Sequence, residues 1–183
     1  MTEKNRKVRN IALAVLVAAI GAGLAWWITV GPTVEVERTC SGILWRNHDD
    51  SFCQEVTVTV RGKMNHRTFW GDIAVEGTEL NVTAVRADME NGHAYLDRAR
   101  HFDFSEAPYL AAVLQEGRFS SLVLFVGEVD SVSEEEMQSH FGGEDGLVIS
   151  APCTAREEAV ALFAQLRGKH PGLHPYLSDM DWV

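Results

Sequence analysis

The sequence predicts one transmembrane helix at the N-terminus, followed by a mainly β (α+β) domain. Three observations predict this class. The run from Ile11 to Val30 carries no charged side chain, short segments after Gly31 alternate between apolar and polar residues, and one segment near the C-terminus has helical apolar spacing. About six to eight strands at short intervals with one C-terminal packing helix indicate an antiparallel sandwich or a partly open barrel.

The run from Ile11 to Val30 has the properties of a membrane anchor. A helix of this length, at about 1.5 Å per residue, spans roughly the 30 Å hydrocarbon core of a bilayer. A helix is required there because lipid cannot satisfy free backbone amides. Trp26 and Trp27 stand at its C-terminal end, where indole rings favour the membrane–water boundary. We therefore expect a single-pass anchor.

Charge on either side of the anchor predicts its orientation. Residues 1–9 hold four basic side chains and one acidic side chain, and a basic flank stays on the cytoplasmic side of the membrane. The chain is therefore predicted to lie in the cell membrane with the N-terminus cytoplasmic and the C-terminal domain extracellular. The expected division is a cytoplasmic flank at 1–10, an anchor at 11–30, an extracytoplasmic β-rich domain at 31–168 and a tail at 169–183.

A cleaved signal peptide is the alternative to an uncleaved anchor. Gly23 and Ala25 are small residues at the spacing of a cleavage site. Against cleavage, the apolar run is longer than the roughly 7–15 residues of a signal core, and two bulky tryptophans follow at once. Length therefore favours the anchor.

The strands are predicted from alternation. Val56, Val58 and Val60 alternate with polar residues, which indicates a half-buried strand. Segments 37–46 and 53–61 form a hairpin that turns near residues 47–50, and Leu122 to Val126 is apolar on both faces, which places it centrally. Further strands are predicted at residues 69–75, 78–85, 93–98 and 147–149.

Helices and loops are predicted from caps and breakers. Thr154 and Glu157 have capping-box spacing, with Gly168 as the stop signal, so a helix is expected from Thr154 to Arg167. Pro108 indicates a short helix within 105–117. The acidic segment 131–143 is expected to be a loop with one helical turn.

The outer domain is acidic. Residues 31–183 contain 12 basic and 25 acidic residues, a formal charge of −13. Such a surface repels the phosphates of nucleic acids and of anionic lipid head groups, so we expect neither as a partner. It suits solubility outside the cytoplasm, or a cationic partner.

The three cysteines are Cys40, Cys53 and Cys153. Outside the cytoplasm two of them could pair. The expected hairpin places Cys40 and Cys53 out of register, so no pair is indicated. Cys153 precedes a helix, whose dipole favours a thiolate, but packing of a small residue is the favoured interpretation.

The metal-ligand candidates are His48, Asp49, His101 and Asp103. His48 is followed by Asp49 and a further aspartate, and His101 and Asp103 are two residues apart; imidazole and carboxylate suit zinc or manganese. No further ligand is spaced to complete a site, and His48 and Asp49 stand at an expected turn. We therefore assign no metal, cofactor or catalytic residue.

Exposed aromatic residues are a lead to protein contacts. Trp45, Phe52, Phe69 and Trp70 flank the first hairpins, and an exposed aromatic among charges fits a protein interface. The alternative is that the C-terminal helix covers them.

One block of sequence carries a resemblance. The strand Gly146 to Pro152 leads into a helix through Arg156 to Ala159, and the segment Phe69 to Gly77 precedes it. In these features residues 67–167 resemble small membrane-anchored or lipoprotein-like proteins of Gram-positive bacteria. The resemblance implies an extracytoplasmic location and a β-rich fold, but no activity and no functional residues.

The favoured function is a membrane-tethered extracytoplasmic interaction or sensor domain without enzymatic activity. A metal-dependent hydrolase that uses His48, Asp49, His101 and Asp103 is one alternative. An accessory subunit of a membrane complex is another.

Overall fold

The computed structural model describes residues 3–78, 80–89, 92–96, 109–129, 139–141 and 146–169. Two helices and nine strands are formed by these residues. They are α1 (Glu3–Thr29), β1 (Val34–Arg46), β2 (Asp49–Met64), β3 (Thr68–Glu76), β4 (Asn81–Asp88), β5 (His93–Tyr95), β6 (Tyr109–Glu116), β7 (Ser121–Val129), β8 (Ser139–Phe141), β9 (Leu147–Ala151) and α2 (Arg156–Lys169).

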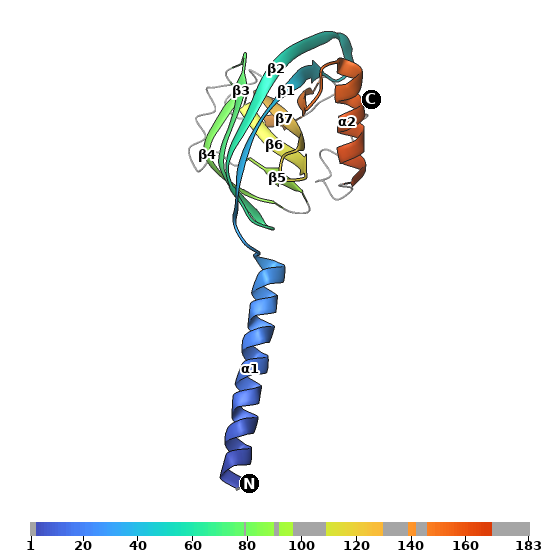
Figure 1. Cartoon of the computed structure of the whole chain (residues 1–183). Helices are drawn as coiled ribbons and strands as arrows, with labels where there is room; N and C mark the ends of the chain where they lie inside the picture. Colours follow the sequence, from blue (N-terminus) through green and yellow to red (C-terminus); the bar gives the residue numbers. More distant parts are fainter. Residues whose placement is uncertain are drawn as a thin grey trace.

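The strands form one antiparallel sheet in the order β4-β3-β2-β1-β9-β7-β6-β5, with β8 paired to β7. Strand β1 pairs with both β2 and β9 and so joins an N-terminal meander to a C-terminal one. The sheet curls into a nearly closed eight-strand barrel, and α2 packs against its outer side (Figure 1). Of the two architectures predicted from the sequence, the partly open barrel is confirmed.

The inside of the barrel is an apolar core. Val56, Val58 and Val60 of β2 are buried there, as their alternation predicts. Phe69 meets Phe119, from the β6–β7 turn, with ring centroids 4.8 Å apart. A Cβ atom at Gly71 would lie 2.0 Å from a backbone oxygen of β2 and 2.8 Å from Phe69 Cζ. Glycine at that position therefore gives the Phe69 ring its space, since packed interiors tolerate no such overlap.

A second apolar core lies between the sheet and α2. Trp45 of β1 and Phe125 of β7 contact Phe163 of α2, with ring centroids 5.6 Å and 6.0 Å apart. Strand β7 serves both cores: Leu122 and Leu124 face the inside of the barrel, while Phe125 faces α2. The central position predicted for this strand is confirmed, because it is covered on both faces.

The C-terminal helix is confirmed, with three corrections. It begins at Arg156 rather than Thr154, and it continues through Gly168 to Lys169. Its N-terminal cap is made by Glu158 instead of the predicted Glu157. The Glu158 carboxylate accepts hydrogen bonds from the Thr154 backbone N at 2.9 Å and from the Thr154 hydroxyl at 3.0 Å. The capping-box spacing therefore predicted the acceptor carboxylate one residue too early in the sequence.

Two other predictions are wrong where the structure describes them. Residues 109–116 form strand β6 and no helix; residues 105–108 lie outside the described residues. Residues 139–141 form strand β8 within the segment predicted as a loop, and the rest of that segment lies outside the description. A register shift between Leu110 and Ala112 breaks the alternation of β6, which explains why its pattern is not that of a strand.

Helix α1 projects from one end of the barrel (Figure 1). It contains Asn10–Trp27, a stretch long and apolar enough to cross a membrane by length and composition. None of that stretch is buried against the rest of the protein. Leu16 and Trp27 are 56% and 57% exposed, which fits an anchor or a signal sequence.

Candidate functional site

His48 and Asp49, the metal-ligand candidates in the β1–β2 turn, have structural roles in that turn. His48 has a positive φ of 57°, which turn residues such as histidine tolerate. Asp49 accepts hydrogen bonds from the Ser51 hydroxyl at 2.6 Å and the Ser51 backbone N at 2.9 Å. These hydrogen bonds lower the pKa of the Asp49 carboxyl. His101 and Asp103 lie outside the described residues.

The second acid of this turn, Asp50, forms an ion pair with an arginine of the protein. Its Oδ1 lies 2.8 Å from Nη1 of Arg156. The same guanidinium donates to the Arg46 carbonyl oxygen at 3.4 Å and lies over the Trp45 ring. Arg156 thus ties the first turn of α2 to the β1–β2 hairpin. Among the residues that the structure describes, no group of three or more His, Cys, Asp or Glu side chains could hold a metal ion.

The cysteines are free thiols in three environments: Cys53 is exposed, Cys40 is half-buried and Cys153 is buried. Cys40 faces Val58 and Cys53 faces Trp45 across the hairpin, so the predicted lack of register is confirmed. Burial raises the pKa of the Cys153 thiol to about 11, and its Sγ donates to the Ser150 carbonyl oxygen at 2.7 Å. Packing therefore describes Cys153 better than an activated thiolate.

The four aromatic candidates separate into buried and exposed residues. Trp45 and Phe69 are fully buried, so they are not exposed contact residues, and for Trp45 the alternative of cover by the C-terminal helix is confirmed. Trp45 lies under α2, where its Nε1 donates to the Ser150 hydroxyl at 3.0 Å. Phe52 is half-buried, with the Arg46 guanidinium 5.7 Å from its ring centroid. Trp70 is exposed at 38%.

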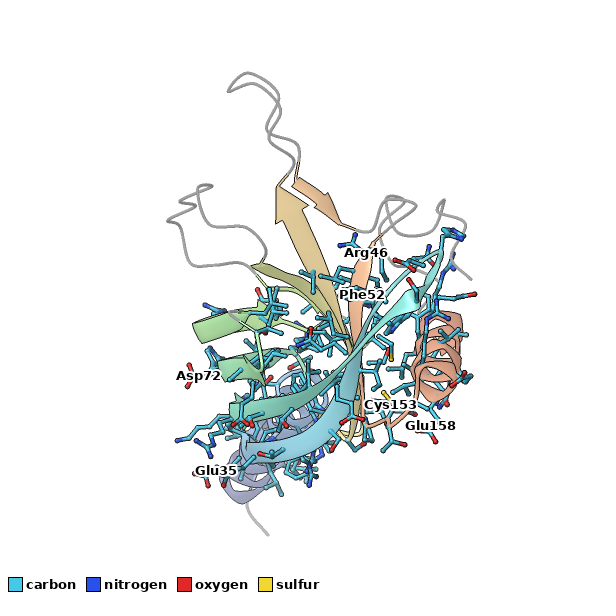
Figure 2. All side chains as sticks on the ribbon, turned by 90° about the horizontal axis from the view of Figure 1, so that it is seen from above. Glu35, Arg46, Phe52, Asp72, Cys153 and Glu158 are labelled. Atoms are coloured by element: carbon cyan, nitrogen blue, oxygen red, sulfur yellow. The ribbon has the colours of Figure 1, made fainter. Side chains whose placement is uncertain are left out.

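A groove on the outer face of the barrel is the candidate site. It has a volume of about 420 Å³. Strands β1, β2 and β3 form its floor and wall, and the segment that leads into α2 closes the other side. Figure 2 shows Cys153 and Glu158 at this junction of barrel and helix. The groove is lined by Ser41, Gly42, Glu55, Val56, Thr57, Glu76, Gly77, Cys153 and Thr154. We call this set the outer groove.

Strand register places two acids, Glu55 and Glu76, beside the outer groove. Glu76 is the cross-strand partner of Thr57, and Glu55 is two residues before Thr57 on β2. Both carboxylates are exposed. The Gln54 amide donates to the Gly77 carbonyl oxygen at 3.3 Å and holds the end of β3 in place. The floor is thus fixed by sheet pairing, and the acids stand at its edge.

The outer groove offers acceptors to a ligand. Its polar side chains are two carboxylates and the hydroxyls of Ser41, Thr57 and Thr154. Hydrogen bonds from Thr154 lower the pKa of the nearby Glu158 carboxyl, so that side chain stays charged beside the groove. Negative charge and acceptor oxygens favour a cationic ligand with N–H donors.

Comparison with protein-family models, with curated proteins and with solved structures finds no match to this chain.

Sequence patterns did not identify the outer groove. Its lining comes from four segments that are separate in the sequence, namely 41–42, 55–57, 76–77 and 153–154. Register brings them together, and no local spacing predicts register between distant strands. The available signal was an exposed acid on each of two neighbouring strands, Glu55 on β2 and Glu76 at the end of β3.

Proposed function

We propose that this chain is a membrane-tethered, outward-facing interaction domain that binds a basic segment of a partner protein. The observation that carries the tether is the uncovered apolar surface of α1. Its membrane-length stretch Asn10–Trp27 has no contact with the barrel that would bury it. Apolar surface of that extent needs another apolar medium, and a bilayer supplies it.

The charge distribution supports the orientation. Four basic residues precede the anchor and the acidic domain follows it, which is the arrangement of a cytoplasmic N-terminus and an external C-terminal domain. Trp26 and Trp27 are exposed at the end of α1 next to the barrel, where an outer membrane–water boundary would lie.

Charge complementarity supports the basic partner. The domain carries a formal charge of −13, and the outer groove places Glu55 and Glu76 beside hydroxyl groups. Lysine and arginine side chains supply the N–H donors that these acceptors need. Their approach would also be accelerated by the long-range field of the acidic surface.

A peptide-binding experiment tests the groove. The full chain in nanodiscs is titrated with a fluorescein-labelled lysine- and arginine-rich peptide, and with the same peptide carrying glutamate at the basic positions. The basic peptide should bind and the acidic peptide should not. The double variant E55Q/E76Q should weaken binding about tenfold, since each exposed charge pair contributes up to about 1 kcal/mol.

The matched control is E35Q/E37Q, which removes two acids of β1 outside the outer groove. Its loss of affinity measures the effect of net charge, together with loss of the exposed Glu37–Arg61 ion pair, and should be smaller than that of E55Q/E76Q. Equal losses from both double variants would refute the groove as the binding site. Absence of binding by the basic peptide would refute the basic partner.

A further inference from the structure

The turn between β2 and β3 is held against the end of the anchor. The His66 backbone N donates to the Val30 carbonyl oxygen at 3.2 Å. A Cβ atom at Gly31 would lie 2.0 Å from Cδ2 of the His66 ring, so the absence of a side chain at Gly31 allows this contact. If α1 spans a bilayer, as proposed above, this end of the barrel lies next to the membrane surface.

An exposed tryptophan lies on the outer face at this end. Beyond α1, the exposed large apolar side chains of the described residues are Val30 and Trp70. Trp70 is the cross-strand partner of Lys63 on β2 and of Arg86 on β4. The three side chains therefore stand in one row across three strands, with the indole between two cations.

The local charge at this end differs in sign from that of the whole domain. Lys63, Arg67 and Arg86 outnumber Glu35 and Asp88 in the described segments 30–36, 63–70 and 86–89. Arg86 Nε lies 3.8 Å from Asp88 Oδ1, and Glu35 on β1 is the cross-strand partner of Lys63, so the basic excess of these segments is one charge. The repulsion of anionic lipid expected from the average charge of −13 is therefore weaker at this end than over the rest of the domain.

We propose that Lys63, His66, Arg67, Trp70 and Arg86, the basic rim, rest on anionic phospholipid head groups of the bilayer that holds α1. Indole rings favour the head-group region, and each lysine or arginine near an anionic surface strengthens attachment about fivefold. The proposal depends on the membrane tether. It adds a second contact that fixes how the barrel stands on the membrane.

This orientation would present the outer groove away from the lipid. The rim row contains Lys63 and the groove contains Thr57, six residues apart along β2. At about 3.3 Å per residue that separation is roughly 20 Å. A partner could then reach the groove while the rim stays on the surface.

Fluorescence quenching by brominated lipid tests the basic rim. The full chain is reconstituted in vesicles of phosphatidylcholine, or of phosphatidylcholine with phosphatidylglycerol, each with plain or brominated acyl chains. Emission of W70F is subtracted from that of the wild type, which removes the signals of the anchor tryptophans and isolates Trp70. Bromine should quench the Trp70 component in the anionic vesicles and leave it unquenched in the zwitterionic ones.

Substitutions sharpen the same experiment. K63Q, R67Q and R86Q should each lower the ratio of docked to undocked domain about fivefold, and added salt should lower it further. R46Q is the matched control, because Arg46 lies beside the β1–β2 turn at the end of the barrel remote from α1 (Figure 1). It should leave the quenching unchanged.

Two results would overturn the rim proposal: an unquenched Trp70 in anionic vesicles, or quenching that is equal in both compositions. Failure of the tether gives a different result, because the chain would then not float with vesicles of either composition. Flotation of every sample therefore separates the two proposals.

Discussion

Helix α1 exposes its apolar side chains, whereas the barrel buries side chains of the same kinds. Ile11 and Leu16 of α1 are 65% and 56% exposed, whereas Leu122 and Leu124 of β7 are fully buried. The barrel strands bury their apolar side chains against each other and against α2. The helix buries none of its membrane-length stretch.

The difference shows that the barrel buries its own apolar surface and that α1 does not. Burial of apolar surface stabilises the barrel from within, and eight strands enclose an interior just wide enough for side chains to fill. Helix α1 contributes nothing to either core, so its apolar surface must be covered by something outside the chain. Helix α1 and the barrel should therefore respond to mutation independently.

The largest expected effect is on the second apolar core, which lies between the sheet and α2. Trp45→Ala removes a fully buried ring that contacts Phe163, and it should lower the free energy of unfolding by about 3–5 kcal/mol. Trp70→Ala is the control, because Trp70 is an exposed tryptophan and its loss should cost no more than about 0.5 kcal/mol. Urea denaturation of the full chain in detergent measures both. Similar losses would show that burial does not distinguish these two residues.

A charge placed in α1 should weaken the insertion of this helix into a membrane and leave the stability of the barrel unchanged. Leu16→Arg places a cation in the middle of α1, at a cost of about 3 kcal/mol for insertion. The chain should shift from the membrane fraction to the soluble fraction, with the urea midpoint of the barrel unaltered. Leu16→Phe, which is apolar, should stay in the membrane fraction. A lower barrel midpoint in Leu16→Arg would mean that the two regions are coupled.

Alkaline pH should weaken the junction of barrel and α2 through Cys153. Its pKa is raised to about 11 from an ordinary value near 9, so between these values the unfolded chain loses a proton that the folded chain keeps. The free energy of unfolding should then fall by up to about 3 kcal/mol as pH rises through this range. The difference between wild type and Cys153→Ala, measured by urea denaturation from pH 8 to 11, isolates this effect. A difference that does not change with pH would contradict it.

The smallest expected effect is at the cap of α2. Thr154→Ala removes the hydroxyl that donates to Glu158. Because this hydrogen bond is exposed, its loss should lower the free energy of unfolding only slightly. The lowered pKa of Glu158 means that its contribution is present above the ordinary carboxyl pKa and is lost as pH falls below it. The effect of Thr154→Ala should therefore shrink in acid. An equal effect at pH 7 and pH 3 would indicate that Glu158 is not the acceptor.

Strands with a regular pattern could be predicted from the sequence, and irregular ones could not. Val56, Val58 and Val60 alternate and are buried on one face of β2. Strand β6 carries a register shift and apolar residues on both faces, so its pattern is not periodic and a nearby proline misleadingly indicated a helix. Local patterns report which face of an element is buried, and they lose that information where a strand is bulged or covered on both sides.

The candidate site was less predictable than the fold. The two acids of the outer groove and the row of Lys63, Trp70 and Arg86 are assembled by pairing between strands. Net charge predicted repulsion of anionic lipid, but an average over the domain does not describe one end of the barrel. Trp45 and Trp70 each follow a bulky apolar residue, and only the position of α2 shows that the first is covered.

The most direct test of the tethered, outward-facing domain uses its exposed cysteine. Cys53 is exposed, Cys40 is half-buried and Cys153 is buried, so a membrane-impermeant maleimide applied to intact cells should label Cys53. C53S should be labelled much less, and C40S/C53S should stay unlabelled. The labelled chain should also keep its full mass of 20.3 kDa and remain in the membrane after alkaline carbonate extraction. Labelling that requires cell lysis, or a labelled chain shortened near residue 25 and released from the membrane, would contradict the account.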